Sequence, residues 1–133
     1  MSENPETKRV LVVEDNRINR LVAVQILRRM SVEAAEASSG PEALQLLAEH
    51  DFDLVLMDVQ MPGMDGLETS RRIRAGEESV RNAQIPIIAM TAYAGAEDER
   101  ACYDAGMDNY VAKPLNMERF MQTVRTALGE DQT

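Results

Sequence analysis

Three short, nearly continuous apolar runs constrain the fold of this chain more than any other feature of its sequence. They lie at residues 10–13 (VLVV), 53–57 (DLVLM) and 86–90 (PIIAM). Runs of this length without polar alternation are typical of strands that are covered on both faces, as in a parallel sheet. Two weaker candidate strands, residues 33–37 and 109–112, bring the expected number of strands to five.

Segments with helical periodicity separate these strands. We expect helices at about residues 17–30, 41–49, 67–75, 97–105 and 117–128. Ser39 and Asn116 are suited to helix N-caps, while Gly76, Gly106 and Gly129 fall where helix C-caps belong. Alternating strands and helices predict an α/β fold with right-handed crossovers, in which helices cover both faces of a doubly wound, five-stranded parallel sheet.

Length, charge and composition narrow the class of protein. We expect one domain at residues 9–128, with polar tails at 1–8 and 129–133. No apolar run approaches the roughly 20 residues that span a bilayer, and the polar start lacks the apolar stretch of a signal peptide. Cys102 is the single cysteine, which suits a reducing cytosol. A net charge of −9 without a basic cluster argues against nucleic-acid binding. These features predict a cytoplasmic domain that binds neither membrane nor nucleic acid.

Polar side chains follow four of the five expected strands. Glu14 and Asp15 follow the first strand, Asp58 the third, Thr91 the fourth and Lys113 the fifth. An open parallel sheet binds its ligands beyond the carboxyl ends of its strands. These side chains are therefore expected to converge at one edge of the sheet.

The three acids predict a site for a hard divalent cation. Clustered carboxylates raise one another's pKa unless a positive charge compensates them. Mg²⁺ binds carboxylate and phosphate oxygens, whereas zinc and copper prefer histidine and thiolate sets, which the chain lacks. An aspartate carboxylate is a competent nucleophile in phosphoryl transfer. Lys113 and Thr91 could then neutralise and hydrogen-bond a phosphoryl group on Asp58.

Each of these residues also has a simpler structural explanation. Glu14 and Asp15 could be acids favoured by a helix N-terminus, and Asp58 could be a turn former before Pro62-Gly63. A threonine can cap a helix, and most lysines are solvated. The position of all these residues at carboxyl ends of strands favours the functional interpretation.

The motifs resemble those of response-regulator receiver domains of two-component and phosphorelay signalling. They are Glu14-Asp15, the run LMDVQMPGMDG at residues 56–66, Thr91-Ala92 and Lys113-Pro114. The resemblance covers residues 9–128 and implies a flavodoxin-like (βα)₅ fold with strand order 2-1-3-4-5. The segment DNRINR at residues 15–20 is similar to receivers attached to hybrid histidine kinases.

The resemblance implies a role for each matching residue. Asp58 matches the phosphoacceptor, Lys113 the phosphoryl-contacting lysine, and Thr91 and Tyr110 the switch residues. The implied Mg²⁺ ligands are Asp15, Asp58, the backbone carbonyl of Gln60 and, through water, Glu14. Glu14 departs from the more frequent aspartate, which leaves its distance to the metal open. Positions 60 and 93 modulate phosphoryl lifetime in the family, so Gln60 and Tyr93 leave that lifetime open here.

The first expected helix also predicts a partner surface. Helical periodicity assigns one stripe to the core: Val22, Ala23, Ile26, Leu27 and Met30. Exposed apolar residues near the site could form a docking patch, although scattered ones are normal. That patch comprises Ile18, Leu21, Val24 and Leu115. In receiver domains this surface resembles the one that histidine kinases and histidine phosphotransfer domains use.

Three rival functions remain at this level. A Mg²⁺-dependent phosphohydrolase would need a second acid, but position 60 is Gln. A flavodoxin-like cofactor binder would need phosphate-cradling residues after the first strand, where Glu14 and Asp15 stand. A receiver-like module without phosphorylation would not need the complete site. The sequence leaves the cognate kinase, the oligomeric state and the isomer of the Lys113–Pro114 peptide open, as well as the choice between a stand-alone regulator and part of a larger protein.

Overall fold

A computed structural model describes residues 7–92 and 95–129. The strands are β1 (Arg9–Val13), β2 (Glu33–Ala37), β3 (Leu54–Asp58), β4 (Ile87–Thr91) and β5 (Asn109–Ala112). The helices are α1 (Arg17–Arg29), α2 (Gly40–Glu49), α3 (Gly66–Arg74), α4 (Ala96–Asp104) and α5 (Met117–Ala127), with a short 3₁₀ turn, η1 (Glu77–Ser79). The strands form one parallel sheet in the order β2-β1-β3-β4-β5. The predicted fold class and strand order are confirmed.

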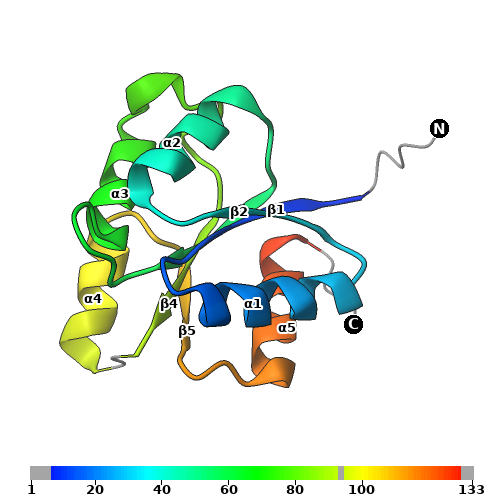
Figure 1. Cartoon of the computed structure of the whole chain (residues 1–133). Coiled ribbons are helices and arrows are strands. Elements are labelled where there is room, and N and C mark those ends of the chain that lie inside the picture. Colours follow the sequence, from blue (N-terminus) through cyan, green and yellow to red (C-terminus); the bar gives the residue numbers. More distant parts are fainter. Residues whose placement is uncertain (1–6, 93–94, 130–133) are drawn as a thin grey trace.

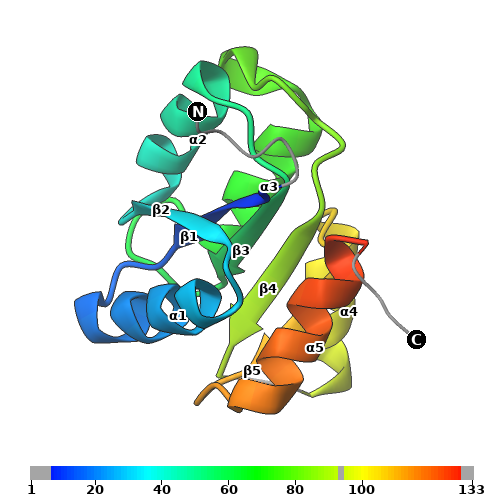
Figure 2. The ribbon, with the colours of Figure 1, turned by 90° about the vertical axis from the view of Figure 1, so that its right-hand side faces the viewer.

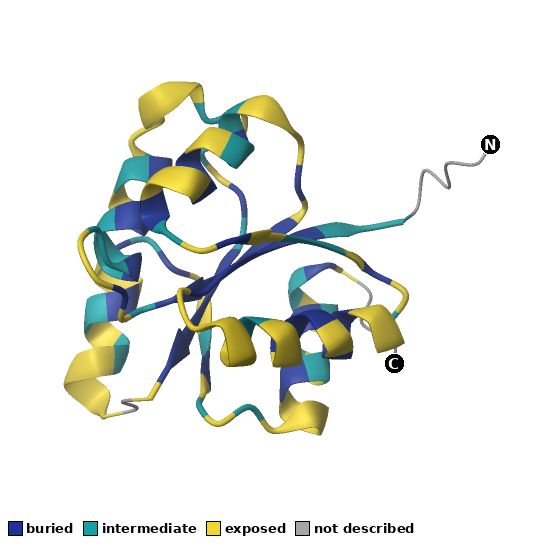
Figure 3. Ribbon diagram, in the orientation of Figure 1, coloured by how far each residue is buried: buried dark blue, intermediate teal, exposed yellow. Residues whose placement is uncertain are grey.

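Helices cover both faces of the sheet. Figures 1 and 2 show α1 and α5 together on one face and α2, α3 and α4 on the other. Alternate residues of each strand serve the two faces: Leu11 and Val13 pack with the α2–α3–α4 side, whereas Val10 and Val12 pack with α1 and α5. The central strands β3 and β4 are therefore buried on both sides, and exposed residues lie on the outer faces of the helices, in loops and on the edge strands (Figure 3).

Local signals in the sequence explain the element boundaries. The Ser39 side chain accepts a hydrogen bond from the Glu42 amide, and the Asn116 side chain accepts one from the Arg119 amide, as expected for N-caps. Gly76, Gly106 and Gly129 adopt positive φ at the ends of α3, α4 and α5. The predicted boundaries lie within one residue of the observed ones. η1 was not predicted.

The orientation of α1 differs from the prediction at two positions. Val22 is 43% exposed, whereas Val24 is 1% exposed and packs in the core with α5 residues. At 100° per residue these valines lie on opposite flanks of the Ala23–Ile26–Leu27 stripe, and periodicity alone does not decide which flank is buried. The placement of Val22 in the core was wrong, and so was that of Val24 on the surface. α1 contacts both β2 and α5, which buries the Val24 flank.

Two further features complete the description of the fold. The peptide between Lys113 and Pro114 is cis. Within the described residues, no helix has the length and apolar character needed to cross a membrane.

Candidate functional site: an acidic cluster with a central lysine

The parallel register brings the predicted polar residues to one edge of the sheet. β1 and β3 pair up to Val13 and Met57, so Glu14 and Asp58 leave neighbouring strands at the same level. β4 ends at Thr91, which pairs with Ala112, the residue before Lys113. Four of the five strands therefore contribute to one site, as the sequence predicted.

Lys113 lies between two buried carboxylates. Its Nζ atom is 2.9 Å from Glu14 Oε1 and 2.9 Å from Asp58 Oδ1. Glu14 and Asp58 are only 1% and 2% exposed. Burial raises the pKa of Asp58 to about 7; Lys113 opposes this shift and Glu14 adds to it. Burial alone would lower the pKa of Lys113, but its hydrogen bonds to Asp58 and Glu14 and their charges raise it.

Asp15 completes a cluster of three acids. Glu14, Asp15 and Asp58 each offer one carboxylate oxygen, and these oxygens lie within 4.8 Å of one another. When ionised the acids carry three negative charges, and Lys113 supplies one positive charge, so two negative charges remain. Apart from its contact with Lys113, the buried Glu14 Oε1 has no hydrogen-bond partner in the described part of the chain. A hard divalent cation fits this excess of oxygen ligands and charge.

Backbone amides hold the carboxylates in place. The Asn16 amide donates to Glu14 Oε2 and the Gln60 amide donates to Asp58 Oδ1, both at 3.2 Å. After Gln60 the chain returns against the end of β3, where Gly66 N donates to Val59 O. A Cβ atom at Gly66 would collide with the Asp58 carbonyl, so this close return requires glycine. The loop thus keeps Gln60, which is exposed, next to Asp58.

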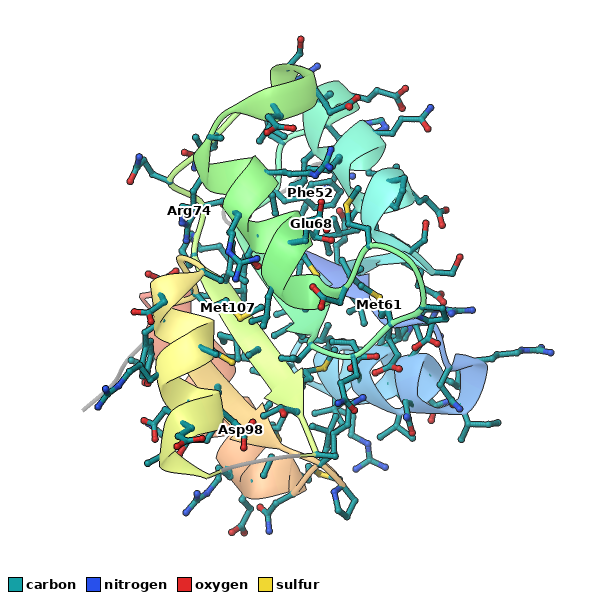
Figure 4. The ribbon with its side chains drawn as sticks, turned by 90° about the vertical axis from the view of Figure 1, so that its left-hand side faces the viewer. Phe52, Met61, Glu68, Arg74, Asp98 and Met107 are labelled. Atoms are coloured by element: carbon teal, nitrogen blue, oxygen red, sulfur yellow. The ribbon has the colours of Figure 1, made fainter. Side chains whose placement is uncertain are left out.

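The predicted switch residues lie on β4 and β5. Thr91 is buried at the end of β4, and Tyr110 on β5 packs against the α2–α3–α4 side of the core. A cavity of about 550 Å³ opens beside Thr91 and is bordered by Met61 and Asp98. Figure 4 shows Met61 on the loop after β3 and Asp98 on α4. Tyr93 lies outside the described residues.

An apolar surface adjoins the acidic cluster. Ile18 and Leu21 of α1 are 66% and 46% exposed, and Val22 lies on the same helical face. Leu115, which is partly buried, and Val22 line a cavity of about 370 Å³ that also reaches Glu14 and Lys113. Because Val24 is buried, it does not belong to this surface. Val22 was missed, although its i, i+4 spacing from Ile18 was the signal that could have identified it.

Comparison with known families identifies the chain. The family model described as response regulator receiver domain matches residues 10–125. The chain belongs to this family. As a receiver domain it is a phosphoacceptor switch of two-component and phosphorelay signalling.

A response regulator and a sensor protein align along most of the chain. The polar-differentiation response regulator DivK of Brucella ovis is 38% identical over 124 residues, which are 93% of this chain and 98% of DivK. The sensor protein GacS of Pseudomonas syringae pv. syringae is 41% identical over 116 residues, or 87% of this chain. That alignment spans 13% of GacS, so it covers only a small part of that relative.

Solved receiver structures superimpose closely on the fold. The receiver domain of sensor histidine kinase PA1611 from Pseudomonas aeruginosa PAO1 has a TM-score of 0.82 at 33% identity, covering 92% of this chain and 98% of that one. In that structure a magnesium ion is coordinated in the active-site cleft. The receiver domain of Ssk1 from Saccharomyces cerevisiae, solved in complex with the histidine phosphotransfer protein Ypd1, has a TM-score of 0.80 at 31% identity, covering 90% and 87%.

Proposed function

We propose that Asp58 accepts the phosphoryl group in this receiver domain. The observation that carries the proposal is the position of Lys113 Nζ, 2.9 Å from both Asp58 Oδ1 and Glu14 Oε1 at the edge of the sheet. A lysine held there is ready to neutralise an anion that forms on Asp58. Asp58 also lies at the carboxyl end of the central strand β3, where the ligand site of this fold class is expected.

We further propose that Mg²⁺ is the required cation. Its ligands would be Asp15, Asp58 and the Gln60 carbonyl, with Glu14 acting through water. The excess negative charge of the cluster and the magnesium ion in the similar PA1611 receiver support this assignment. When bound, the ion would compensate the charge on the phosphoryl oxygens.

The transfer requires few changes in the protein. A carboxylate oxygen of Asp58 attacks phosphorus, the P–N bond to a partner histidine breaks, and its electron pair returns to the imidazole. A new P–O bond gives the aspartyl phosphate. Lys113 then pairs with a phosphoryl oxygen, and the Thr91 hydroxyl donates to another. Position 60 offers Gln in place of the second acid that a phosphohydrolase would need, so the site suits holding a phosphoryl group more than turning a substrate over.

Phosphorylation would bias a two-state surface. Thr91 is the last residue of β4. Tyr110 lies on the neighbouring strand β5 and pairs with Ala89 of β4. A hydrogen bond that draws Thr91 toward the phosphoryl group changes the space beside Tyr110 and α4. This region would therefore report the state of Asp58 to partners.

The proposed phosphoryl donor is a histidine kinase or a histidine phosphotransfer domain. The exposed apolar face of Ile18, Leu21 and Val22, together with Leu115, lies beside the site and suits an apolar helical partner. The complex of the similar Ssk1 receiver with Ypd1 supports this partner class.

Intact mass measurement tests the proposal. The full chain is incubated with a small acyl-phosphate donor and Mg²⁺. We expect a mass gain of one phosphoryl group, which is lost with a chelator and in Asp58→Asn. Asp53→Asn is the matched control, because Asp53 lies just before the same strand at the opposite edge of the sheet, where it accepts a hydrogen bond from the Arg9 amide. No mass gain under any condition would refute the proposal, and sustained turnover of the donor would indicate a hydrolase.

A further inference from the structure

Arg20 bridges the edge strand β2 and the segment that carries two of the site acids. Its Nη1 atom donates to the Glu14 carbonyl at 2.8 Å, and its Nε atom donates to Glu36 Oε1 at 2.8 Å. The Arg20 side chain is mostly buried. Two bonds from different nitrogens of a planar guanidinium fix both its position and its orientation.

The carbonyl that Arg20 holds belongs to the peptide between Glu14 and Asp15. Since a peptide unit is planar, fixing its oxygen also fixes the direction in which the chain enters Asp15. The amide side of Glu14 is held as well, because it donates to Ala37 O at 3.0 Å. β2 therefore holds this segment twice, directly through Ala37 and indirectly through Glu36 and Arg20.

Asp15 depends on this backbone support more than the other two acids do. Glu14 and Asp58 are buried, and each carboxylate contacts Lys113 and a backbone amide. The Asp15 side chain is exposed and makes no hydrogen bond to any other residue in the described ranges. The placement of Asp15 therefore depends on the backbone of the Glu14–Asp15 peptide.

We propose that Arg20 is a positioning residue for divalent-cation binding. Together with Glu36 it orients the Glu14–Asp15 peptide so that the two acids face Asp58. The inference rests on the proposed Mg²⁺ site and assigns Arg20 no contact with the ion. Outer groups that orient metal ligands commonly change affinity by an order of magnitude or more.

A positioning role and a purely electrostatic role of Arg20 predict opposite effects of its removal on Mg²⁺ binding. A cationic side chain near a cation site opposes binding by simple electrostatics, so removing it should tighten Mg²⁺ binding. Loss of orientation should weaken binding instead. The direction of the change in Mg²⁺ affinity therefore distinguishes the two roles. If Arg20 contributed only to stability, the Mg²⁺ affinity of the folded variant would stay unchanged.

Isothermal titration calorimetry, in which Mg²⁺ is added to the metal-free full chain, tests this inference. We expect Arg20→Met to raise the Kd for Mg²⁺ about three- to tenfold, since the lost contact is to backbone rather than to a ligand atom. Arg20→Lys keeps a donor and should give an intermediate Kd. Arg72→Met is the matched control, because it removes the same charge from an ion pair with Glu68 and Glu77 on the α3 side, and it should leave the Kd unchanged.

The outcomes separate this inference from the proposed function. Equal or tighter Mg²⁺ binding by Arg20→Met overturns the positioning role. If Arg20→Met does not fold, Arg20→Lys decides: a Kd at least about twofold above wild type supports the role, and an unchanged Kd overturns it. A wild-type chain that binds no Mg²⁺ would instead contradict the cation site itself, and the inference would fail with it.

Discussion

The buried Asp58 carboxylate lies beside two other carboxylates, those of Glu14 and Asp15, and contacts Lys113. Burial disfavours its charged form and raises its pKa to about 7, so between about pH 4 and pH 7 the metal-free site holds a proton that the unfolded chain would release. In the proposed phosphoryl transfer the nucleophile is the Asp58 carboxylate. A bound divalent cation would favour this charged form and so would prepare Asp58 for the reaction.

Metal-free protein should lose stability as pH rises. The pKa of Asp58 is raised above its ordinary value of 3.8, so between about pH 4 and pH 7 the folded state binds more protons than the unfolded state. The free energy of unfolding therefore falls over this window and levels off above it. Asp58→Asn should remove this component and stabilise the metal-free chain at pH 8 by about 1 to 3 kcal/mol. Urea unfolding in chelator at pH 5 and pH 8 measures both effects, and an equal pH response of the two proteins would contradict the assignment.

Lys113→Met should be strongly destabilising in the metal-free chain. The substitution leaves the buried Glu14 and Asp58 carboxylates without their cation, and breaking a buried ion pair from one side costs about 3 to 5 kcal/mol. Saturating Mg²⁺ should recover part of this loss, because it supplies positive charge to the same oxygens. Urea unfolding with and without Mg²⁺ measures the difference. In an Asp58→Asn background the loss should be smaller, and an undiminished loss would mean that Lys113 acts elsewhere.

One flank of α1 packs in the core, and the other flank is exposed at the surface. Val24 packs in the core with α5, whereas Val22 lies beside Ile18 and Leu21 at the apolar surface. These two valines therefore provide a matched pair within one helix. They separate a contribution to folding from a contribution to partner binding.

Val22→Ser and Val24→Ser should have opposite consequences. Val24→Ser places a hydroxyl and a cavity in the core and should cost about 2 to 4 kcal/mol of unfolding free energy. Val22→Ser should change stability by less than about 1 kcal/mol but slow phosphoryl transfer from a cognate kinase. Leu21→Ser should behave like Val22→Ser. Transfer rates with the partner, compared with phosphorylation by a small acyl phosphate, isolate docking; unchanged rates for both surface variants would remove the docking proposal.

The sequence predicted elements better than orientations. The apolar runs of β1, β3 and β4 and the residues that follow them were sufficient to predict the sheet edge and its acids. The buried flank of α1 was not predictable, because Val22 and Val24 are equivalent in periodicity and differ only in what packs against them. The Arg20 bridge was not predicted either: its partner Glu14 follows β1 and its partner Glu36 lies on β2, and only the fold brings them together.

Arg74 joins three segments at the opposite edge of the sheet. Its guanidinium donates to the carbonyls of Ala83, Ile85 and Gly106 and to Asp108 Oδ2, at distances of 2.7 to 2.9 Å. Asp108 also accepts from the Ile87 amide, so the network connects α3, the start of β4 and the turn before β5. Figure 4 shows Arg74 at the end of α3, well apart from Asp98 near the start of α4. The sheet thus carries the proposed functional site at the carboxyl ends of its strands and a structural polar network at the opposite ends.

Arg74→Met should separate stability from function across the molecule. The substitution leaves three carbonyls and a carboxylate without this donor, which should cost about 2 to 4 kcal/mol. Arg72→Met, two residues away, breaks surface ion pairs that solvent screens, so it should leave the free energy of unfolding nearly unchanged. Both variants should keep the wild-type Kd for Mg²⁺ and full phosphorylation at temperatures where they remain folded. Urea unfolding and Mg²⁺ titration measure the two properties. A weakened Mg²⁺ affinity in folded Arg74→Met would show that the two edges are energetically coupled through β4, contrary to the independence expected for sites this far apart.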